Sequence, residues 1–248
     1  MSDYRTPDSL EILQRFDEIE AQRGQSDKKR DGRGYLFVWI PLAGVSGRYR
    51  DKQTGRFVSS VTVRREIDIY LDTSDSTVRV LSELLRNRNI SLADWELAMR
   101  REIKRTHLNA IAMQRGGWAN MRPSDYGRAG QIIRGQYAYL RNFANQIADG
   151  TQRLDGTFIR RAEMYTQAGR NSFYQSAHAN MKAGVTHVMS NRHARDSCID
   201  CIELDGRWFV IGDPRYRLPG NRQCRVNCRC SETYGYMGDD GMVTAGTI

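Results

Sequence analysis

Five cysteines are the residues of this chain whose type and spacing most clearly specify a chemistry. None occurs in the first 197 residues, and all five follow within 33 residues: Cys198, Cys201, Cys224, Cys228 and Cys230. A Cys-x-x-Cys turn such as the first pair presents two thiolates to one ion, and a second cluster further along the chain completes a tetrahedral site. The pattern predicts a structural Zn²⁺ site.

Two other uses of the cysteines remain open at this point. Disulfides form in oxidising compartments, but the first eight residues lack an apolar stretch, so no secretory signal peptide is expected, and the number of cysteines is odd. A thioredoxin-like redox pair normally lies in a βαβ unit, and the residues around Cys198 and Cys201 show no such pattern. Zinc is therefore the preferred interpretation over disulfides, free thiols and redox chemistry.

Five thiolates exceed a four-coordinate site by one. The expected ligands are Cys198, Cys201 and Cys224, together with either Cys228 or Cys230. Four protein ligands leave no position for an activated water, so the predicted role is structural. His193 precedes the first cysteine by five residues, and it is a further candidate, as a ligand or as a hydrogen-bond partner of one.

The sequence contains no motif that predicts catalysis. A phosphate-binding loop, a Gly-x-Ser-x-Gly elbow and a His-Glu-x-x-His helix are all absent. A zinc-bound HNH-type nuclease needs histidines within the module, and none follows Cys201. We therefore expect a protein that is not an enzyme.

The charge of the chain is strongly positive. The formal net charge is +9 and the isoelectric point about 9.5, and basic residues concentrate over 48–65 and 100–134. Such a surface suits nucleic acid or an acidic protein, although solvated helix faces give the same composition. No apolar run approaches the roughly 20 residues of a membrane helix, so we expect a soluble protein of intracellular origin with no membrane partner.

The elements that must position the cysteines predict an α+β fold. It comprises a mostly helical body, a short β-rich N-terminal segment and a small C-terminal zinc-bound β module. The predicted divisions are an N-terminal helix and linker arm (1–34), a β-rich segment (35–75), a helical domain (76–184), the cysteine zinc module (185–235) and a C-terminal tail (236–248).

Within these divisions, periodicity and capping residues predict individual elements. The arm is an amphipathic helix over 7–20 followed by a polar linker over 22–34. Strands are expected over 35–40, 56–63, 185–189 and 208–211, and the tail is expected to be irregular. Helices are expected over 77–86, after a cap at Ser91, from Ser124 to a stop at Gly150, and over 157–182.

Three local patterns resemble a known family. The first is Gly-Gly-Trp-Ala-Asn-Met-Arg-Pro-Ser-Asp-Tyr-Gly-Arg over 116–128, followed by Gln-Tyr-Ala-Tyr-Leu-Arg-Asn-Phe over 136–143. The second is Arg-Ala-Glu-Met-Tyr over 161–165, and the third runs from Asp-Ser-Cys-Ile-Asp-Cys at 196 to Asn-Cys-Arg-Cys at 230. Over about residues 90–235 the chain is similar to the Mu F-like minor head proteins, the head-morphogenesis family of tailed bacteriophages. The family often shows Pro-x-His-x-x-Cys-Arg-Cys at the second cluster, whereas here Arg225 stands at the histidine position beside Cys224.

The resemblance implies a structural protein of the virion. Such a minor capsid protein lies in the head or neck at or near the portal, in a few copies within a symmetric assembly, and is assembled in the bacterial host cytoplasm. Its partners are the portal and/or major capsid protein, with viral DNA as a further partner through the basic surface, and it acts in head assembly and in DNA packaging or ejection. The alternative from the residues alone is an intracellular zinc-containing protein that binds or processes nucleic acid.

Overall fold

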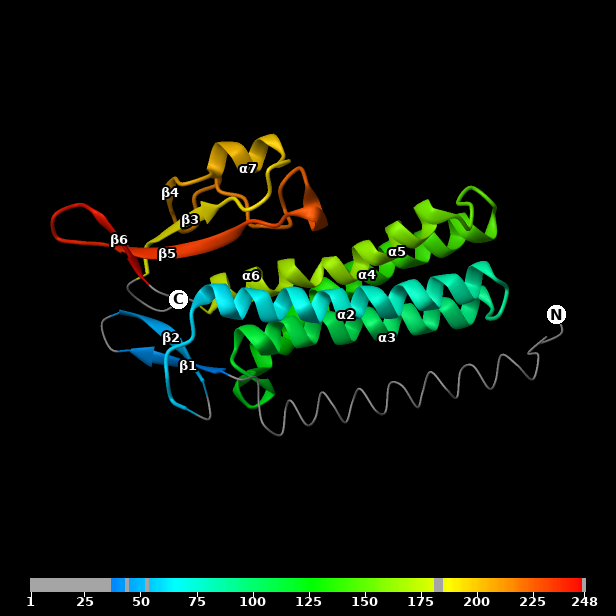
Figure 1. Cartoon of the computed structure of the whole chain (residues 1–248), viewed down its shortest axis with the longest axis horizontal. Coiled ribbons are helices and arrows are strands. Elements are labelled where there is room, and N and C mark those ends of the chain that lie inside the picture. The colour runs from blue at the N-terminus through cyan, green and yellow to red at the C-terminus, as the bar shows by residue number, and fades with distance from the viewer. Residues whose placement is uncertain (1–36, 43–44, 52–53, 181–184, 247–248) are drawn as a thin grey trace.

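The chain folds into a long helical bundle with a small antiparallel sheet over one end (Figure 1). The computed structural model describes residues 37–42, 45–51, 54–180 and 185–246. The helices of the bundle are α2 (Ser60–Arg86), α3 (Leu92–Gln114), α4 (Pro123–Ala148), α5 (Gly156–Gln167) and α6 (Gly169–Ala179). The predicted N-terminal helix and linker, within 1–34, lie outside the described residues.

Two sheets accompany the bundle. A hairpin pairs β1 (Phe37–Leu42) with β2 (Val45–Asp51). The larger sheet has the order β4-β3-β5-β6, with every neighbouring pair antiparallel. Its strands are β3 (His187–Asn191), β4 (Trp208–Val210), β5 (Ser231–Met237) and β6 (Val243–Gly246). The α+β class predicted from the sequence is confirmed at this level.

Short polar side chains start the helices where the sequence places them. The Ser91 hydroxyl accepts a hydrogen bond from the backbone N–H of Asp94 at 3.1 Å, and Asp155 accepts from the N–H of Thr157 at 2.8 Å. At the other end of α4, Gly150 adopts φ +79°, which a residue with a side chain rarely does. The predicted start at Ser91 and stop at Gly150 are confirmed. The predicted cap at Ser124 is wrong, because Arg122 is the N-cap and Pro123 the first helical residue.

The core of the bundle is aromatic at its centre. The rings of Trp95, Phe143 and Phe158 lie with centroids 5.4–5.7 Å apart, and all three side chains are fully buried. They come from α3, α4 and α5, so one cluster joins three helices. The helices predicted from their periodicity thus supply the apolar core of the bundle.

The strand predicted over 56–63 is wrong. The segment begins α2 at Ser60 instead of forming a strand over 56–63, so the boundary at 75/76 falls inside one continuous helix. Val63, Ile67 and Leu71 recur every four residues and are all buried. That is the helical period, and packing against the neighbouring helices outweighs the β preference of Val and Ile.

The single helix expected over 157–182 is two helices. The helix is interrupted at Ala168, and α6 starts at Gly169. A Cβ on Gly169 would lie 2.7 Å from Thr106 Cγ2 and 2.9 Å from Leu71 Cδ2, so α6 approaches α2 and α3 too closely for any side chain here. The tail was also predicted wrongly, because β6 pairs with β5 and thereby joins the sheet.

Gly169→Ala is expected to lower the free energy of unfolding by about 1–3 kcal/mol, because the new methyl group overpacks a buried contact. Gly135→Ala is the matched control. It is the same change inside α4, where a Cβ meets nothing within 4 Å, so it should stabilise the helix by about 1 kcal/mol. Urea unfolding of both variants measures the difference, and equal effects would contradict the close approach.

The buried His107 is expected to make the folded protein less stable in acid. Burial lowers its pKa to about 4. Its Nδ1 lies 2.6 Å from Ser172 Oγ, while its buried Nε2 has no hydrogen-bond partner among the residues that the structure describes. The unfolded chain binds a proton near the ordinary pKa of about 6.5, so stability from this residue is present above that value and declines as the pH falls toward 4. Between pH 7 and 5 the wild type should lose about 2 kcal/mol more than His107→Gln in urea unfolding. If the wild type and His107→Gln lose the same stability between pH 7 and 5, His107 is not the source of the acid sensitivity.

Candidate metal centre

Two short helical turns present the cysteines. Cys198 is the N-cap of α7 (Ile199–Leu204), and the N–H of Cys201 donates to the carbonyl of Cys198 at 3.0 Å, so one turn places both thiols on the same side. Cys224 and Cys228 flank the short helix η2 (Arg225–Asn227). Cys230 immediately precedes β5. The chain between the two turns carries β4, so the sheet brings together cysteines that are far apart in sequence.

The sulfur atoms are spaced as metal ligands are. Cys201 Sγ lies 3.5 Å from Cys198 Sγ, 3.6 Å from Cys224 Sγ and 3.7 Å from Cys228 Sγ. Four sulfurs bound at 2.3 Å around a tetrahedral ion lie about 3.8 Å apart. A disulfide needs about 2.0 Å, and all five cysteines are free. The spacing therefore fits a metal and does not fit a disulfide.

The five thiols form two overlapping groups. The first is Cys198, Cys201 and Cys224, and the second is Cys201, Cys228 and Cys230; within each, the sulfurs lie within 4.8 Å of one another. Cys201, Cys228 and Cys230 are each about 2% exposed. The cluster could thus hold a metal ion with thiolate ligands alone, and Cys201 is central because it belongs to both groups.

The packing of the cluster opposes the ionisation of Cys201 and Cys230 without a cation. Burial raises the pKa of Cys201, and the pKa of Cys230 is raised by its hydrogen bond to Cys228 and by burial. The same hydrogen bond from Cys230 lowers the pKa of Cys228 to about 4. Five sulfurs this close cannot all carry negative charge unless a cation lies among them, which is what a bound metal supplies.

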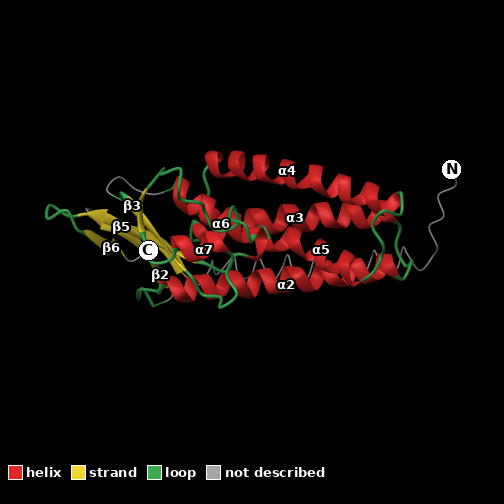
Figure 2. Ribbon diagram, turned by 90° about the horizontal axis from the view of Figure 1, so that it is seen from above, coloured by secondary structure: helices red, strands yellow, loops and turns green. Residues whose placement is uncertain are grey.

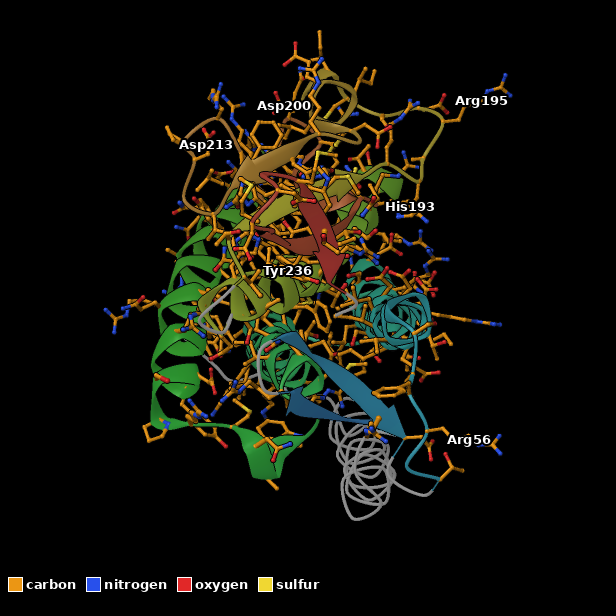
Figure 3. All side chains as sticks on the ribbon, turned by 90° about the vertical axis from the view of Figure 1, so that its left-hand side faces the viewer. Arg56, His193, Arg195, Asp200, Asp213 and Tyr236 are labelled. Carbon is orange, nitrogen blue, oxygen red and sulfur yellow. The ribbon has the colours of Figure 1, made fainter. Side chains whose placement is uncertain are left out.

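His193 belongs to neither of the two thiol groups. Its Nε2 lies 2.6 Å from Ser231 Oγ at the edge of the sheet, and the side chain is exposed. Figure 3 shows His193 and Arg195 on one side of the module. Within the part of the chain that the structure describes, both candidate metal groups consist of cysteines only, so His193 is not among the ligands that the geometry favours.

A buried arginine beside the cluster has no signal in the sequence. Arg222 is 1% exposed, and its Nη1 lies 3.7 Å from Cys201 Sγ and 2.8 Å from Ser190 Oγ. Its Nε donates to the Arg217 carbonyl at 2.8 Å. One guanidinium therefore contacts the shared thiol, β3 and the loop before Cys224. Only the tertiary structure distinguishes it from the exposed arginines nearby.

A second unpredicted feature joins the sheet to the bundle. The fully buried carboxylate of Glu232 on β5 accepts hydrogen bonds from the hydroxyls of Tyr216 (2.7 Å) and Tyr234, and it lies 3.1 Å from His178 Nε2 on α6. Burial and the neighbouring Glu232 raise the pKa of both tyrosines, so each hydroxyl keeps its proton and donates. The cysteine module is thus fixed to α6 by a buried polar network.

Arg170 adds a connection between α6 and the thiol cluster. It is 9% exposed, its Nη2 lies 2.6 Å from Asp68 Oδ1 on α2, and its Nη1 donates to the Cys228 carbonyl at 3.4 Å. Movement of the second cysteine turn would therefore disturb an ion pair inside the bundle.

Comparisons with known proteins identify no relative. No described helix is long and apolar enough to cross a membrane. No family model, no curated protein and no solved structure matches the chain.

Proposed function

We propose that the chain is a structural minor head protein of a tailed bacteriophage, located at or near the portal. In this role it acts in head assembly and in DNA packaging or ejection, in several copies that contact the portal and/or major capsid protein. The proposal rests on the resemblance of residues 90–235 to the head-morphogenesis family, and on one structural observation: the thiol cluster lies at the joint between a small sheet and a long bundle.

A metal ion bound at this joint would act as a cross-link within the cysteine module. The metal proposed for it is a structural Zn²⁺ held by Cys198, Cys201 and Cys224 with either Cys228 or Cys230. A closed set of four thiolates leaves no coordination position for water or substrate, which supports a role outside catalysis. Bound, the ion would tie α7 and η2 together in a module with little apolar core of its own.

Purified virions test the location. We expect mass spectrometry of intact particles to find the chain in heads, at a copy number far below that of the major capsid protein. Host cells infected with a phage that carries a nonsense mutation in the gene should yield heads with defective packaging or ejection. Absence of the chain from purified virions would refute the proposal.

Metal analysis tests the module separately. Protein purified under reducing conditions should contain about one zinc per chain, as expected for a single structural site. Folded protein that contains no metal would remove the cross-link from the proposal without bearing on the location.

The second candidate is an intracellular zinc-containing protein that binds or processes nucleic acid. The net charge of +9 favours it. It predicts tight binding to a defined nucleotide sequence and absence from virions, whereas the head protein has no need of sequence preference.

A further inference from the structure

The largest share of the net positive charge falls in the segment that holds two neighbouring helices. Residues 92–148, which include α3 and α4, carry nine Lys or Arg and four Asp or Glu, whereas residues 185–246 carry eight of each kind. Helix α2 carries four Arg and five Asp or Glu. Figure 2 shows α4 and α2 at opposite edges of the bundle. The bundle therefore has one basic edge, and the cysteine module is not the source of the charge.

Three of the four acidic side chains on α3 and α4, Glu96, Glu102 and Asp125, are paired with arginines. Asp125 is fully buried and lies 3.0 Å from Arg115 and 3.3 Å from Arg128. Glu102 is also buried and pairs with Arg105. No acidic side chain on these two helices is classed as exposed. An anion that approaches this edge therefore meets cations beside carboxylates that are mostly buried or already paired.

Two exposed cations, Lys104 and Arg134, lie at the border between α3 and α4. Along one face of α3, Glu96, Arg100 and Lys104 follow at intervals of four residues. Glu96 lies 2.9 Å from Arg141 Nε, and the Arg100 guanidinium lies 5.0 Å from the centroid of the Tyr137 ring, so this face borders α4.

Lys104 is the next residue along that border. Because α3 and α4 run antiparallel, the contacts of Glu96 with Arg141 and of Arg100 with Tyr137 place Lys104 near the level of Arg134. Both side chains are exposed, and neither has a hydrogen bond or an ion pair within the part of the chain that the structure describes. Arg134 and Arg141 are seven residues apart, two helical turns on one face, or roughly 10 Å.

We propose that this edge, defined by Lys104, Arg134 and Arg141, binds the phosphate backbone of nucleic acid. Phosphate contacts need exposed cations in a row and no particular base edge. A protein partner would instead need an apolar centre, and the exposed aliphatic side chain on these helices is Leu97.

The inference adds a ligand class to the proposed function without depending on it. DNA binding is measured on the purified protein, whereas head location is measured on virions. A chain that binds DNA but is absent from heads would support this inference and refute the location. A chain that is found in heads but does not bind DNA would refute only the inference.

Fluorescence anisotropy with a labelled double-stranded DNA of mixed sequence, titrated at about 50 and about 200 mM salt, provides the test. Wild type should bind and weaken steeply with salt. The double variant Lys104→Gln/Arg134→Gln should bind on the order of tenfold more weakly at the lower salt, with a salt slope smaller by about two, because two phosphate contacts are lost. Circular dichroism should show both proteins equally folded, since both side chains lie in solvent.

The matched control is Arg195→Gln/Arg207→Gln, which removes the same charge from exposed positions on the cysteine module. It should keep nearly wild-type affinity. If the two double variants weaken binding equally, net charge and not this edge explains the binding, and the proposal is overturned. Failure of the wild type to bind DNA at the lower salt would also overturn it. Binding of polyglutamate as tight as that of DNA would assign the edge to an acidic protein instead.

Discussion

Cys201→Ser is expected to release the metal and unfold the cysteine module. Cys201 is the one thiol in both groups of possible ligands, and it lies within 3.7 Å of three other sulfurs. Binding of a structural zinc contributes on the order of 10 kcal/mol to folding in small zinc modules. Metal content should fall from about one ion per chain to near zero, and limited proteolysis should then cleave within residues 185–246.

The other four cysteines supply the controls for this experiment. If one ion is held by Cys198, Cys201 and Cys224 with one further thiol, serine at Cys198 or Cys224 should also abolish binding. Of Cys228→Ser and Cys230→Ser, one should abolish it and the other should leave it nearly intact, which identifies the fourth ligand. Retention of one zinc per chain by Cys201→Ser would contradict the centre as described.

Glu232→Ala is expected to lower the free energy of unfolding by about 3–5 kcal/mol, the cost of breaking a buried charged network by removal of one partner. The carboxylate has no exposed surface and accepts from Tyr216 and Tyr234 while facing His178. Its loss leaves two buried hydroxyls without an acceptor. The measurement is urea unfolding with saturating zinc, so that metal loss does not contribute.

Glu203→Ala is the control, because this glutamate lies exposed on α7 and surface substitutions usually change stability by less than 0.5 kcal/mol. The loss of stability in Glu232→Gln should lie between those of the two alanine variants, since an amide oxygen still accepts a hydrogen bond from one hydroxyl. If Glu232→Ala and Glu203→Ala unfold at the same urea concentration, the network does not hold the module on α6.

Much of the local structure could be predicted from the sequence. Helix starts at Ser91 and ends at Gly150 follow from side chains that act on their own neighbouring backbone, so no distant residue is needed to predict them. The apolar residues along α3, α4 and α5 recur with the helical period, and Trp95, Phe143 and Phe158 from these three helices meet in the core. The cysteine spacing likewise predicted a common site, because two thiols in one turn have little freedom to diverge.

The errors arose where a distant contact decides the local conformation. Val63 and Ile67 favour strands as isolated residues, but their burial against other helices makes the segment α2. The break at Gly169 depends on the approach of Thr106 and Leu71, which are remote in sequence. The tail becomes β6 because β5 offers it an unpaired edge.

The sequence by itself determined that this protein has a thiol-rich module, a helical body and a basic surface, since these depend on residue type, spacing and short-range capping. The tertiary structure alone decided that Cys201 is shared between two groups, that Arg222 is buried beside it, that Glu232 is buried between the sheet and α6, and that Lys104 and Arg134 lie together at the border of α3 and α4. The physical reason is that burial and charge pairing are properties of surfaces brought together by folding. An arginine beside a thiol and an arginine in solvent therefore look alike until the chain is folded.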